Sequence, residues 1–336
     1  MNCCHDELPK ATLHDGRVVK LGRVKPKGRP QALRLGPYVD LAAANLPDSV
    51  DYTPKAMASI SEMYLNSTLG DCVIASCGHS LGIWTGNDAG KPVLATDQEI
   101  ANVYFFFSPR DQGCVISQVL DYWVATGLKL GGSVHKIDGY VQLDWTNQDL
   151  VKFAIDAFGG VKIGIDLPNA WAVSDPSVPW DVTNSRIVGG HDVLCVGYDS
   201  TGVKVATWGS TRTITWRAFT SRTWLDEAYA MISPDWYGVD GMSPAGLDVA
   251  TLKDDLQKVG QGTIPPLNPT PTPAPTPTPA PVPPAPVVTG LTLEQVAAAI
   301  KAGIAKGAPY GFLNVPAKVQ AAAITAVEDA WPRGNR

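Results

Sequence analysis

Two segments far apart in the chain carry the residue types of a nucleophile and a base. Cys72 follows Leu69-Gly70-Asp71 and begins an apolar run with helical spacing. Because unpaired amide N–H groups in the first turn of a helix stabilise an anion, we expect the pKa of Cys72 to be lowered. His191 follows Gly189-Gly190 and enters an apolar run, Val193 to Val196, that predicts a strand. A thiolate nucleophile needs an imidazole to hold and return the proton, so the pair predicts nucleophilic catalysis by Cys72 and His191.

The same two segments resemble those of the papain-like cysteine peptidases. Leu69-Gly70-Asp71-Cys72 is similar to the Leu-Gly-Ser-Cys that opens the central helix of that family. The run from His191 to Tyr198 is similar to its base, a His followed by an apolar strand ending in Val-Gly-Tyr. Residues 46–52 look like the entry to the mature domain, and Trp208-Gly209 like the end of an Asn-Ser-Trp-Gly. The resemblance covers roughly residues 46 to 235.

This resemblance implies an α+β fold of two subdomains, one helical and one an antiparallel β-sheet, with Cys72 and His191 meeting between them. It implies a cysteine-type endopeptidase that hydrolyses peptide bonds of a peptide or protein substrate without a cofactor or metal. In the family a Gln six residues before the Cys helps to form the oxyanion hole, and Asn66 stands at that position. We therefore expect Asn66 and the Cys72 backbone N–H to hold the oxyanion.

One position departs from the family pattern and leaves the orientation of His191 open. Ala206 stands where the family has the Asn that orients the histidine, two residues before Trp208. Thr207 carries a hydroxyl, but side chains alternate along a strand, so we expect it to point away from Ala206 and from the ring. Asp226 or Asp192 could orient the ring instead, or the enzyme could work as a dyad or have lost activity. We expect Trp208 to shield the histidine.

Two other functions remain open on the same residues. Because Ala206 cannot orient His191, the chain could be an inactive binding or structural protein on a papain-like scaffold. Alternatively, Cys72 and His191 could act on peptidoglycan cross-links or other amides, or in acyl transfer, as other enzymes of this broad fold do.

Net charge, hydropathy and cysteine content indicate which kinds of partner the protein could bind. The net charge of −5 in 336 residues gives no case for binding nucleic acid, and the sequence holds no apolar run long enough to span a membrane. The first residues lack the basic and apolar regions of a secretory signal, so a cytoplasmic or virion-associated protein is compatible with the sequence, which leaves the compartment unknown. The six cysteines show no dense disulfide pattern, and Cys3-Cys4-His5 lacks a second pair of metal ligands.

The chain divides into segments of different character. Residues 16–36 hold seven Lys or Arg and no Asp or Glu within a basic arm that we expect to be a solvated tail. The alternatives are an arm that docks on an acidic surface and a short pro-segment that lies across the cleft. We do not expect inhibition, because the arm is short and has no helical periodicity. Residues 265–286 contain 12 prolines, which favour a polyproline II spacer of roughly 70 Å. Two Ala-rich helices follow, and we expect this small module to dock on a protein partner. The expected segments are the basic arm (1–45), the peptidase domain (46–240), a connecting segment (241–264), the Pro-rich linker (265–287) and a helical hairpin (288–336).

Capping and periodicity locate further elements of the expected peptidase domain. Thr96 to Glu99 forms a capping box before an apolar helix face, and Asn147 begins another helix that ends at Gly159-Gly160. A further helix is expected over residues 115–126. Strands are expected over residues 161–167, 203–208, 213–216 and 228–233.

Overall fold

A computed structural model describes residues 7–237 of the chain, except residues 29–31, 40, 43 and 45. The chain divides into two compact units, residues 1–262 and 263–336. The connecting segment, the Pro-rich linker and the helical hairpin expected from the sequence lie outside the described residues, as does Cys3-Cys4-His5.

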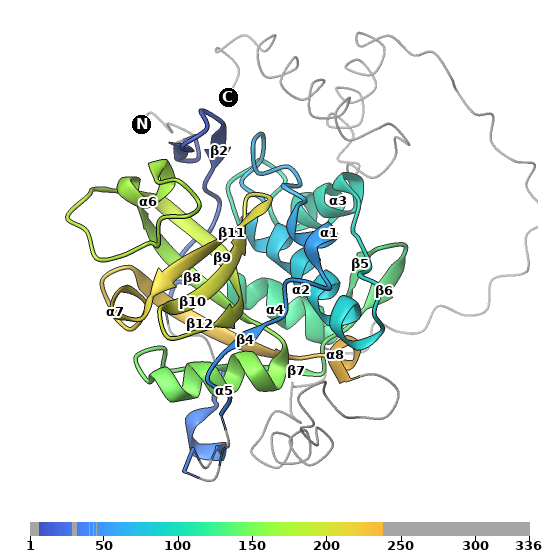
Figure 1. The fold of residues 1–336 in the computed structure, drawn as a ribbon. Helices are drawn as coiled ribbons and strands as arrows, with labels where there is room; N and C mark the ends of the chain where they lie inside the picture. The colour runs from blue at the N-terminus through green and yellow to red at the C-terminus, as the bar shows by residue number, and fades with distance from the viewer. Residues whose placement is uncertain (1–6, 29–31, 40, 43, 45, 238–336) are drawn as a thin grey trace, which may run out of the picture. The chain divides into compact units, whose positions relative to one another are not determined.

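The first half of the described chain forms a helical part around one buried helix. Helix α2 begins at Cys72, and all of its residues from Cys72 to Gly86 are buried. The helix is therefore surrounded by other parts of the protein, whereas the spacing of its apolar residues predicted burial of one face only. Figure 1 shows these helices gathered on one side of the molecule, opposite the sheet. The helices of this part are α1 (Met57–Ile60), α2 (Cys72–Asp88), α3 (Asp97–Phe107) and α4 (Ile116–Ala125).

The second part is built on a mostly antiparallel sheet. Its strand order is β11-β10-β9-β8-β12-β7-β3, with β4 also paired to β9 and only β3 and β7 parallel among the described strands. Long strands β8 and β9 form its centre, where Ile165 lies opposite His191 and Gly164 opposite Asp192. The strands are β3 (Leu33–Arg34), β4 (Val50–Asp51), β7 (Gly139–Gln142), β8 (Val161–Pro168), β9 (Ile187–Tyr198), β10 (Gly202–Thr207), β11 (Ser210–Thr215) and β12 (Leu225–Ile232).

Shorter elements complete the described part. They are β1 (Lys10–Thr12) and β2 (Val18–Lys20), which form a hairpin; η1 (Gly36–Tyr38); the hairpin of β5 (Leu128–Leu130) and β6 (Ser133–His135); and helices α5 (Gln148–Phe158), α6 (Asn169–Val173), α7 (Trp216–Phe219) and α8 (Pro234–Tyr237).

The two capped helices confirm the sequence prediction. Thr96 and Glu99 form a reciprocal capping box at the start of α3. The Asn147 side chain accepts a hydrogen bond from the Leu150 N–H at the start of α5, which ends at Gly159 in the left-handed conformation. Helix α4 and strands β8, β10, β11 and β12 fall within or beside the ranges expected for them. The α+β class and the division into a helical part and an antiparallel sheet are confirmed.

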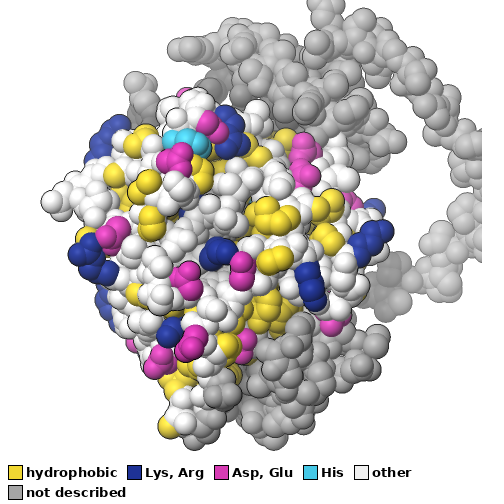
Figure 2. Space-filling view, viewed as in Figure 1, with side chains coloured by type: hydrophobic (Ala, Val, Ile, Leu, Met, Phe, Trp, Pro, Cys, Tyr) yellow, Lys and Arg dark blue, Asp and Glu magenta, His cyan; other side chains and the backbone are white. Residues whose placement is uncertain are grey.

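The surface shows no concentration of one charge on the face drawn in Figure 2, where Lys and Arg side chains lie among Asp and Glu side chains. Every helix formed by the described residues is too short or too polar to cross a membrane. These residues also hold no group of three or more His, Cys, Asp or Glu side chains that could bind a metal ion. The four cysteines in the described range, Cys72, Cys77, Cys114 and Cys195, are buried free thiols.

A buried lysine at the centre of the sheet pairs with a neighbouring strand and also contacts the start of α2. Lys162 of β8 lies with its Nζ 2.9 Å from the Asp192 Oδ2 of β9, and both side chains are fully buried. Lys162 Nζ also donates a hydrogen bond to the Val73 carbonyl oxygen at 3.0 Å and another to the Ser76 hydroxyl. Val73 and Ser76 lie in the first turns of α2, so one ammonium group connects the helix that begins at Cys72 with the strand that carries His191.

We predict that Lys162→Met lowers the free energy of unfolding by about 3–5 kcal/mol, because it leaves the Asp192 carboxylate buried without its counter-ion. Replacing both members, as Lys162→Met with Asp192→Leu, should cost less than the single change. Urea denaturation of the full chain measures both effects. The control is Lys204→Met at the exposed Lys204–Asp51 pair, which should cost at most about 1 kcal/mol. A loss for Lys162→Met no larger than that of the control would contradict this role for the pair.

Candidate active site

Cys72 is the first residue of α2 and is only 1% exposed. Asp71 precedes the helix, and its carboxylate turns back to accept hydrogen bonds from the Leu65 N–H at 3.2 Å and from Asn66 Nδ2 at 2.9 Å. The loop before the helix is therefore held by a buried side chain rather than by a side-chain cap on the helix N-terminus. The Ile74 N–H donates to the Asp71 carbonyl at 2.8 Å, and the helix supplies no acceptor to the N–H groups of Cys72 and Val73.

His191 is fixed on two sides. Its Nε2 lies 2.7 Å from Thr207 Oγ1, and the indole of Trp208 stacks on the imidazole with ring centroids 4.5 Å apart and planes inclined by 16°. The other ring nitrogen, Nδ1, is buried and has no hydrogen-bond partner among the described residues. The imidazole is thus oriented through Nε2 and keeps Nδ1 free for a proton.

The expectation that Thr207 points away from the ring is wrong, because the pairing of β10 with β9 shifts in register between Lys204 and Val205. Such an irregularity reverses the face on which later side chains lie, since side chains alternate along a strand. The Thr207 hydroxyl consequently meets His191. The two-residue turn Trp208-Gly209 between β10 and β11 then turns the chain at positive φ and places the indole over the imidazole.

Helix α2 packs on strand β9, so the two candidate catalytic residues lie on directly contacting elements. The backbone amide of Asp192, the residue after His191, is near enough to the Cys72 sulfur to act on the pKa of its thiol, which it lowers. Lys162 links the same two elements, because it pairs with Asp192 of β9 and donates a hydrogen bond to the Val73 carbonyl of α2. A thiol at the start of a helix and an imidazole on the strand packed against it can exchange a proton when the two side chains come within hydrogen-bond distance.

Comparison with known proteins places this arrangement in a known fold. No protein-family model and no curated protein matches the sequence. The structure is similar to xylellain, a cysteine protease from Xylella fastidiosa, with a TM-score of 0.52 and 16% identity over 67% of this chain and 97% of that one. It is also similar to procathepsin B S9 from Trypanosoma congolense, with a TM-score of 0.50 and 12% identity over 63% of this chain and 86% of that one. The chain has the papain-like fold.

Within this papain-like fold, two of the residues singled out from the sequence lie in other contacts. Asp226 was a candidate to orient His191, but no hydrogen bond joins them among the described residues, because Asp226 is paired with Arg23 and Lys25. The Thr207 hydroxyl is hydrogen-bonded to Nε2 of His191 instead. Asn66 is buried, and one N–H of its amide is donated to Asp71. Its second N–H remains for another acceptor, since a side-chain amide carries two.

The expectation of a lowered pKa for Cys72 is wrong for this state of the protein. Burial raises the pKa of Cys72 to about 12, and the nearby charges of Asp192 and Asp71 act in the same direction. The backbone amides of Asp192 and Gly22 oppose this effect without overcoming it. Burial also lowers the pKa of His191 to about 3. Both groups are consequently neutral at physiological pH in this state.

The cause of this burial is the N-terminal arm, and the expectation of a solvated tail is wrong for its described residues 7–28. Val19 and Leu21 are buried, and the arm runs between the helical part and the sheet (Figure 1). The Gly22 carbonyl accepts a hydrogen bond from the Cys114 N–H at 2.8 Å, and the Arg23 N–H donates to the Gly190 carbonyl at 3.2 Å. The arm therefore bridges both parts directly beside Cys72 and His191.

The arm lies in the orientation of a blocking segment rather than of a substrate. The Gly22 carbonyl oxygen is turned to the Cys114 N–H, whereas a bond to be cleaved must present its carbonyl carbon to the sulfur. Gly22 also lies so close to Gly70 that an added Cβ would stand 1.7 Å from the Gly70 carbonyl oxygen. No side chain fits at position 22, which makes the contact a sensitive point for opening the arm.

We predict that Gly22→Ala displaces the arm and speeds alkylation of Cys72 by iodoacetamide. Overpacking costs about 1–3 kcal/mol, which corresponds to roughly a 5- to 150-fold increase in the open population. Peptide mapping by mass spectrometry at neutral pH follows Cys72 separately from the other cysteines.

The matched control is Gly36→Ala, where the nearest atom to an added Cβ, Leu150 Cδ2, lies at a comfortable 3.8 Å. This variant should label Cys72 at the wild-type rate. Equal rates for Gly22→Ala and the wild type would show that the arm does not limit access to Cys72.

Proposed function

We propose that this protein is a cysteine peptidase in which Cys72 attacks a peptide carbonyl and His191 carries the proton. The observation that supports it most is the fixation of His191: Thr207 holds Nε2 and Trp208 covers the ring, while Nδ1 is buried and unpartnered. A purely structural buried histidine normally has both ring nitrogens satisfied. The papain-like fold, with a cysteine at the start of the helix packed on this strand, supplies the matching nucleophile.

The proposed chemistry follows from that tautomer. With Nε2–H donating to the Thr207 oxygen, the Nδ1 lone pair accepts the thiol proton as the sulfur bonds to the carbonyl carbon. The imidazolium then gives this proton to the leaving amine as the C–N bond breaks, and an acyl-thioester remains on Cys72. Water, deprotonated by His191, attacks the thioester, releases the acid and restores the thiol. The base is thus used twice, and Thr207 keeps its orientation throughout.

The oxyanion formed in each step needs hydrogen-bond donors. The Cys72 backbone N–H lies at the N-terminus of α2, where the helix leaves it unpaired. We propose that the free N–H of Asn66 Nδ2 is the second donor, with Asp71 holding the amide plane through the first. One such donor is worth about 3 kcal/mol in typical hydrolases.

Activity in this proposal requires the arm to leave. While residues 20–24 lie beside the site, Cys72 and His191 are each 1% exposed, and their pKa values of about 12 and about 3 disfavour the thiolate–imidazolium pair. Withdrawal of the arm admits solvent and removes the principal cause of both shifts. The described state is therefore a latent form of the proposed enzyme.

An inactive binding protein on the same fold is the second candidate, and the burial of both Cys72 and His191 in this state is the observation that favours it. Action on peptidoglycan or another amide uses the same Cys72–His191 chemistry. Cleavage of a denatured protein, hydrolysis of cell-wall cross-links alone, or neither, separates the three functions.

We predict that Cys72→Ala, made in the full chain with Gly22→Ala, abolishes hydrolysis of a denatured protein and labelling by the epoxide thiol probe E-64. Loss of a nucleophile typically removes activity by a factor of at least about 1,000. Cys77→Ala is the control, because Cys77 lies about one and a half turns further along α2, with its Sγ 3.2 Å from the Val73 carbonyl oxygen. Labelling of Cys72→Ala at the parental rate would exclude the proposed nucleophile.

We predict that Thr207→Val, in the same background, lowers kcat by about 10- to 100-fold, because the methyl group cannot hold Nε2 and the ring loses the required tautomer. Thr207→Ser should restore most of the rate. Since the effect acts through His191, the acidic limb of the kcat profile should also move in Thr207→Val. An unchanged pH profile and rate would mean that Thr207 only packs against the ring.

A further inference from the structure

Arg23 of the arm reaches an acidic pocket beside the candidate active site. Its side chain is fully buried, although it is among the longest and most strongly charged side chains. Its Nε lies 2.8 Å from Glu227 Oε1, its Nη1 3.5 Å from Asp166 Oδ1, and its Nη2 is paired with Asp226. Asp166 belongs to β8, and the other two carboxylates belong to β12.

The pocket holds more negative charge than Arg23 neutralises. Lys25, which is more than half exposed, lies 2.6 Å from Asp166 Oδ2 and 3.0 Å from Asp226 Oδ2. Glu227 is almost completely buried, and its second oxygen accepts a hydrogen bond from the Tyr229 hydroxyl at 3.1 Å. A buried carboxylate without a cation is strongly unfavourable. When the arm leaves, the pocket consequently favours another cation in its place.

The pocket is built to admit a side chain from the active-site side. Two glycines form the wall around the Arg23 side chain and backbone. A Cβ at Gly164 would stand 2.6 Å from both Arg23 Nε and Glu227 Cγ, and a Cβ at Gly190 would stand 2.4 Å from the Arg23 carbonyl oxygen. Gly190 immediately precedes His191. The absence of side chains at these two positions opens the pocket next to the catalytic strand.

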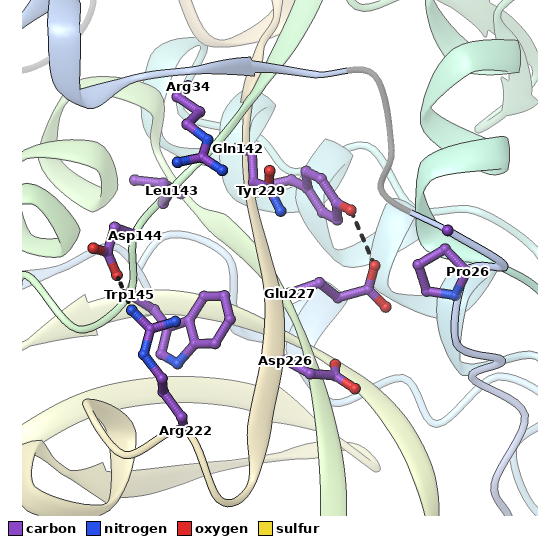
Figure 3. A pocket seen from close by; sticks show the side chains of 11 residues that line it. Pro26, Arg34, Gln142, Leu143, Asp144, Trp145, Arg222, Asp226, Glu227 and Tyr229 are labelled. Atoms are coloured by element: carbon purple, nitrogen blue, oxygen red, sulfur yellow. Dashed lines mark hydrogen bonds and ion pairs between the residues drawn. The ribbon is translucent and has the colours of Figure 1, made fainter.

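The space continues behind Glu227. A cavity of about 310 Å³ is lined by Asp226, Glu227 and Tyr229 of β12 and by Pro26 of the arm. Figure 3 shows Glu227 and Asp226 extending from β12 toward the side of the cavity where Pro26 lies. A side chain as long as arginine or lysine can therefore be accommodated along the row of carboxylates.

We propose that this pocket selects an arginine or lysine side chain of the substrate, with Glu227 and Asp226 as the specificity-determining residues. This inference rests on the proposed peptidase function and names its substrate class. Arg23 is adjacent to Gly22, which packs against Gly70, two residues before Cys72. The Gly22 carbonyl oxygen is bonded to the Cys114 N–H and is therefore not presented to the sulfur. A substrate running in the opposite direction places its basic residue immediately before the residue whose carbonyl is attacked.

Arg23, which occupies the pocket, indicates which kind of substrate side chain the pocket binds. The pocket binds the guanidinium of Arg23, and the backbone of the same arm lies across the candidate active site. The arm is therefore an example of how the pocket binds a basic side chain of a peptide. Guanidinium groups suit such carboxylate clusters because their N–H donors form directed, charge-assisted hydrogen bonds.

Peptide binding to the full chain carrying Cys72→Ala and Arg23→Ala tests this proposal without any need for catalysis. Three fluorescent hexapeptides differ only at one central residue, which is arginine, its uncharged isostere citrulline, or leucine. Fluorescence anisotropy should show the arginine peptide binding at least about tenfold more tightly than the other two, because only arginine supplies the charge. Glu227→Gln added to this chain should reduce the preference to about threefold or less.

Asp144→Asn is the matched control, because Asp144 lines the same cavity but is bonded to Thr146 and Arg222. It should leave the preference unchanged. Arg23→Gln replaces Arg23→Ala if circular dichroism shows that the latter does not fold. Similar affinities for the arginine and citrulline peptides, or no binding by any of the three, would overturn the proposal. Failure of the peptidase function appears separately, as absence of hydrolysis by the chain that retains Cys72.

Discussion

The buried ion pair between Lys162 and Asp192 is the constraint on which the rest of the site depends. The Lys162 ammonium lies 2.9 Å from Asp192 Oδ2 and donates hydrogen bonds to the Val73 carbonyl and the Ser76 hydroxyl. Although burial opposes the charge, Asp192 raises the pKa of Lys162, so the lysine stays protonated. Burial raises the pKa of Asp192 to about 6, and its carboxylate is ionised at neutral pH. Through these contacts, Lys162 fixes the start of α2 against β9.

The second organising interaction is the arm between the helical part and the sheet. It contacts each part through its backbone, at Cys114 and Gly190, and inserts one buried guanidinium among carboxylates of β8 and β12. This arrangement explains two facts together. It accounts for the very low exposure of Cys72 and His191, and it gives the basic composition of the arm a partner in an otherwise uncompensated acidic pocket. Access to the thiol and recognition of basic side chains consequently depend on the same few residues.

Local rules were sufficient for much of the fold. The caps at Thr96 and Asn147 and the glycine at position 159 marked helix ends because they act within a few residues of sequence. The hairpins β1–β2 and β5–β6 escaped prediction because their strands are three residues long, which is too short for a periodic pattern to stand out. The papain-like resemblance at Cys72 and His191 led to the fold, which the structural comparison confirms.

The contacts within the site could not be predicted from the sequence, because they depend on how distant segments pack together. Thr207 was assigned to the wrong face because a shift in strand register leaves no mark in a single sequence, although a hydroxyl next to Trp208 was a reason to consider both faces. The predicted direction of the Cys72 pKa shift was wrong. The helix N-terminus, on which the prediction was based, can be identified from neighbouring residues, whereas the burial of Cys72 comes from an arm 50 residues earlier in the chain. Arg23 and Glu227 are separated by more than 200 residues, so their pairing was invisible to any local rule.

The most direct test of this account is the separation of Cys72 Sγ and His191 Nδ1 in a crystal structure of the full chain. We predict that the two atoms lie within about 4 Å of each other or reach that distance by a single rotamer change, with Nε2 on Thr207. A separation beyond about 7 Å that no rotamer closes, or an imidazole with Nδ1 turned away from α2, would contradict the proposed catalytic pair.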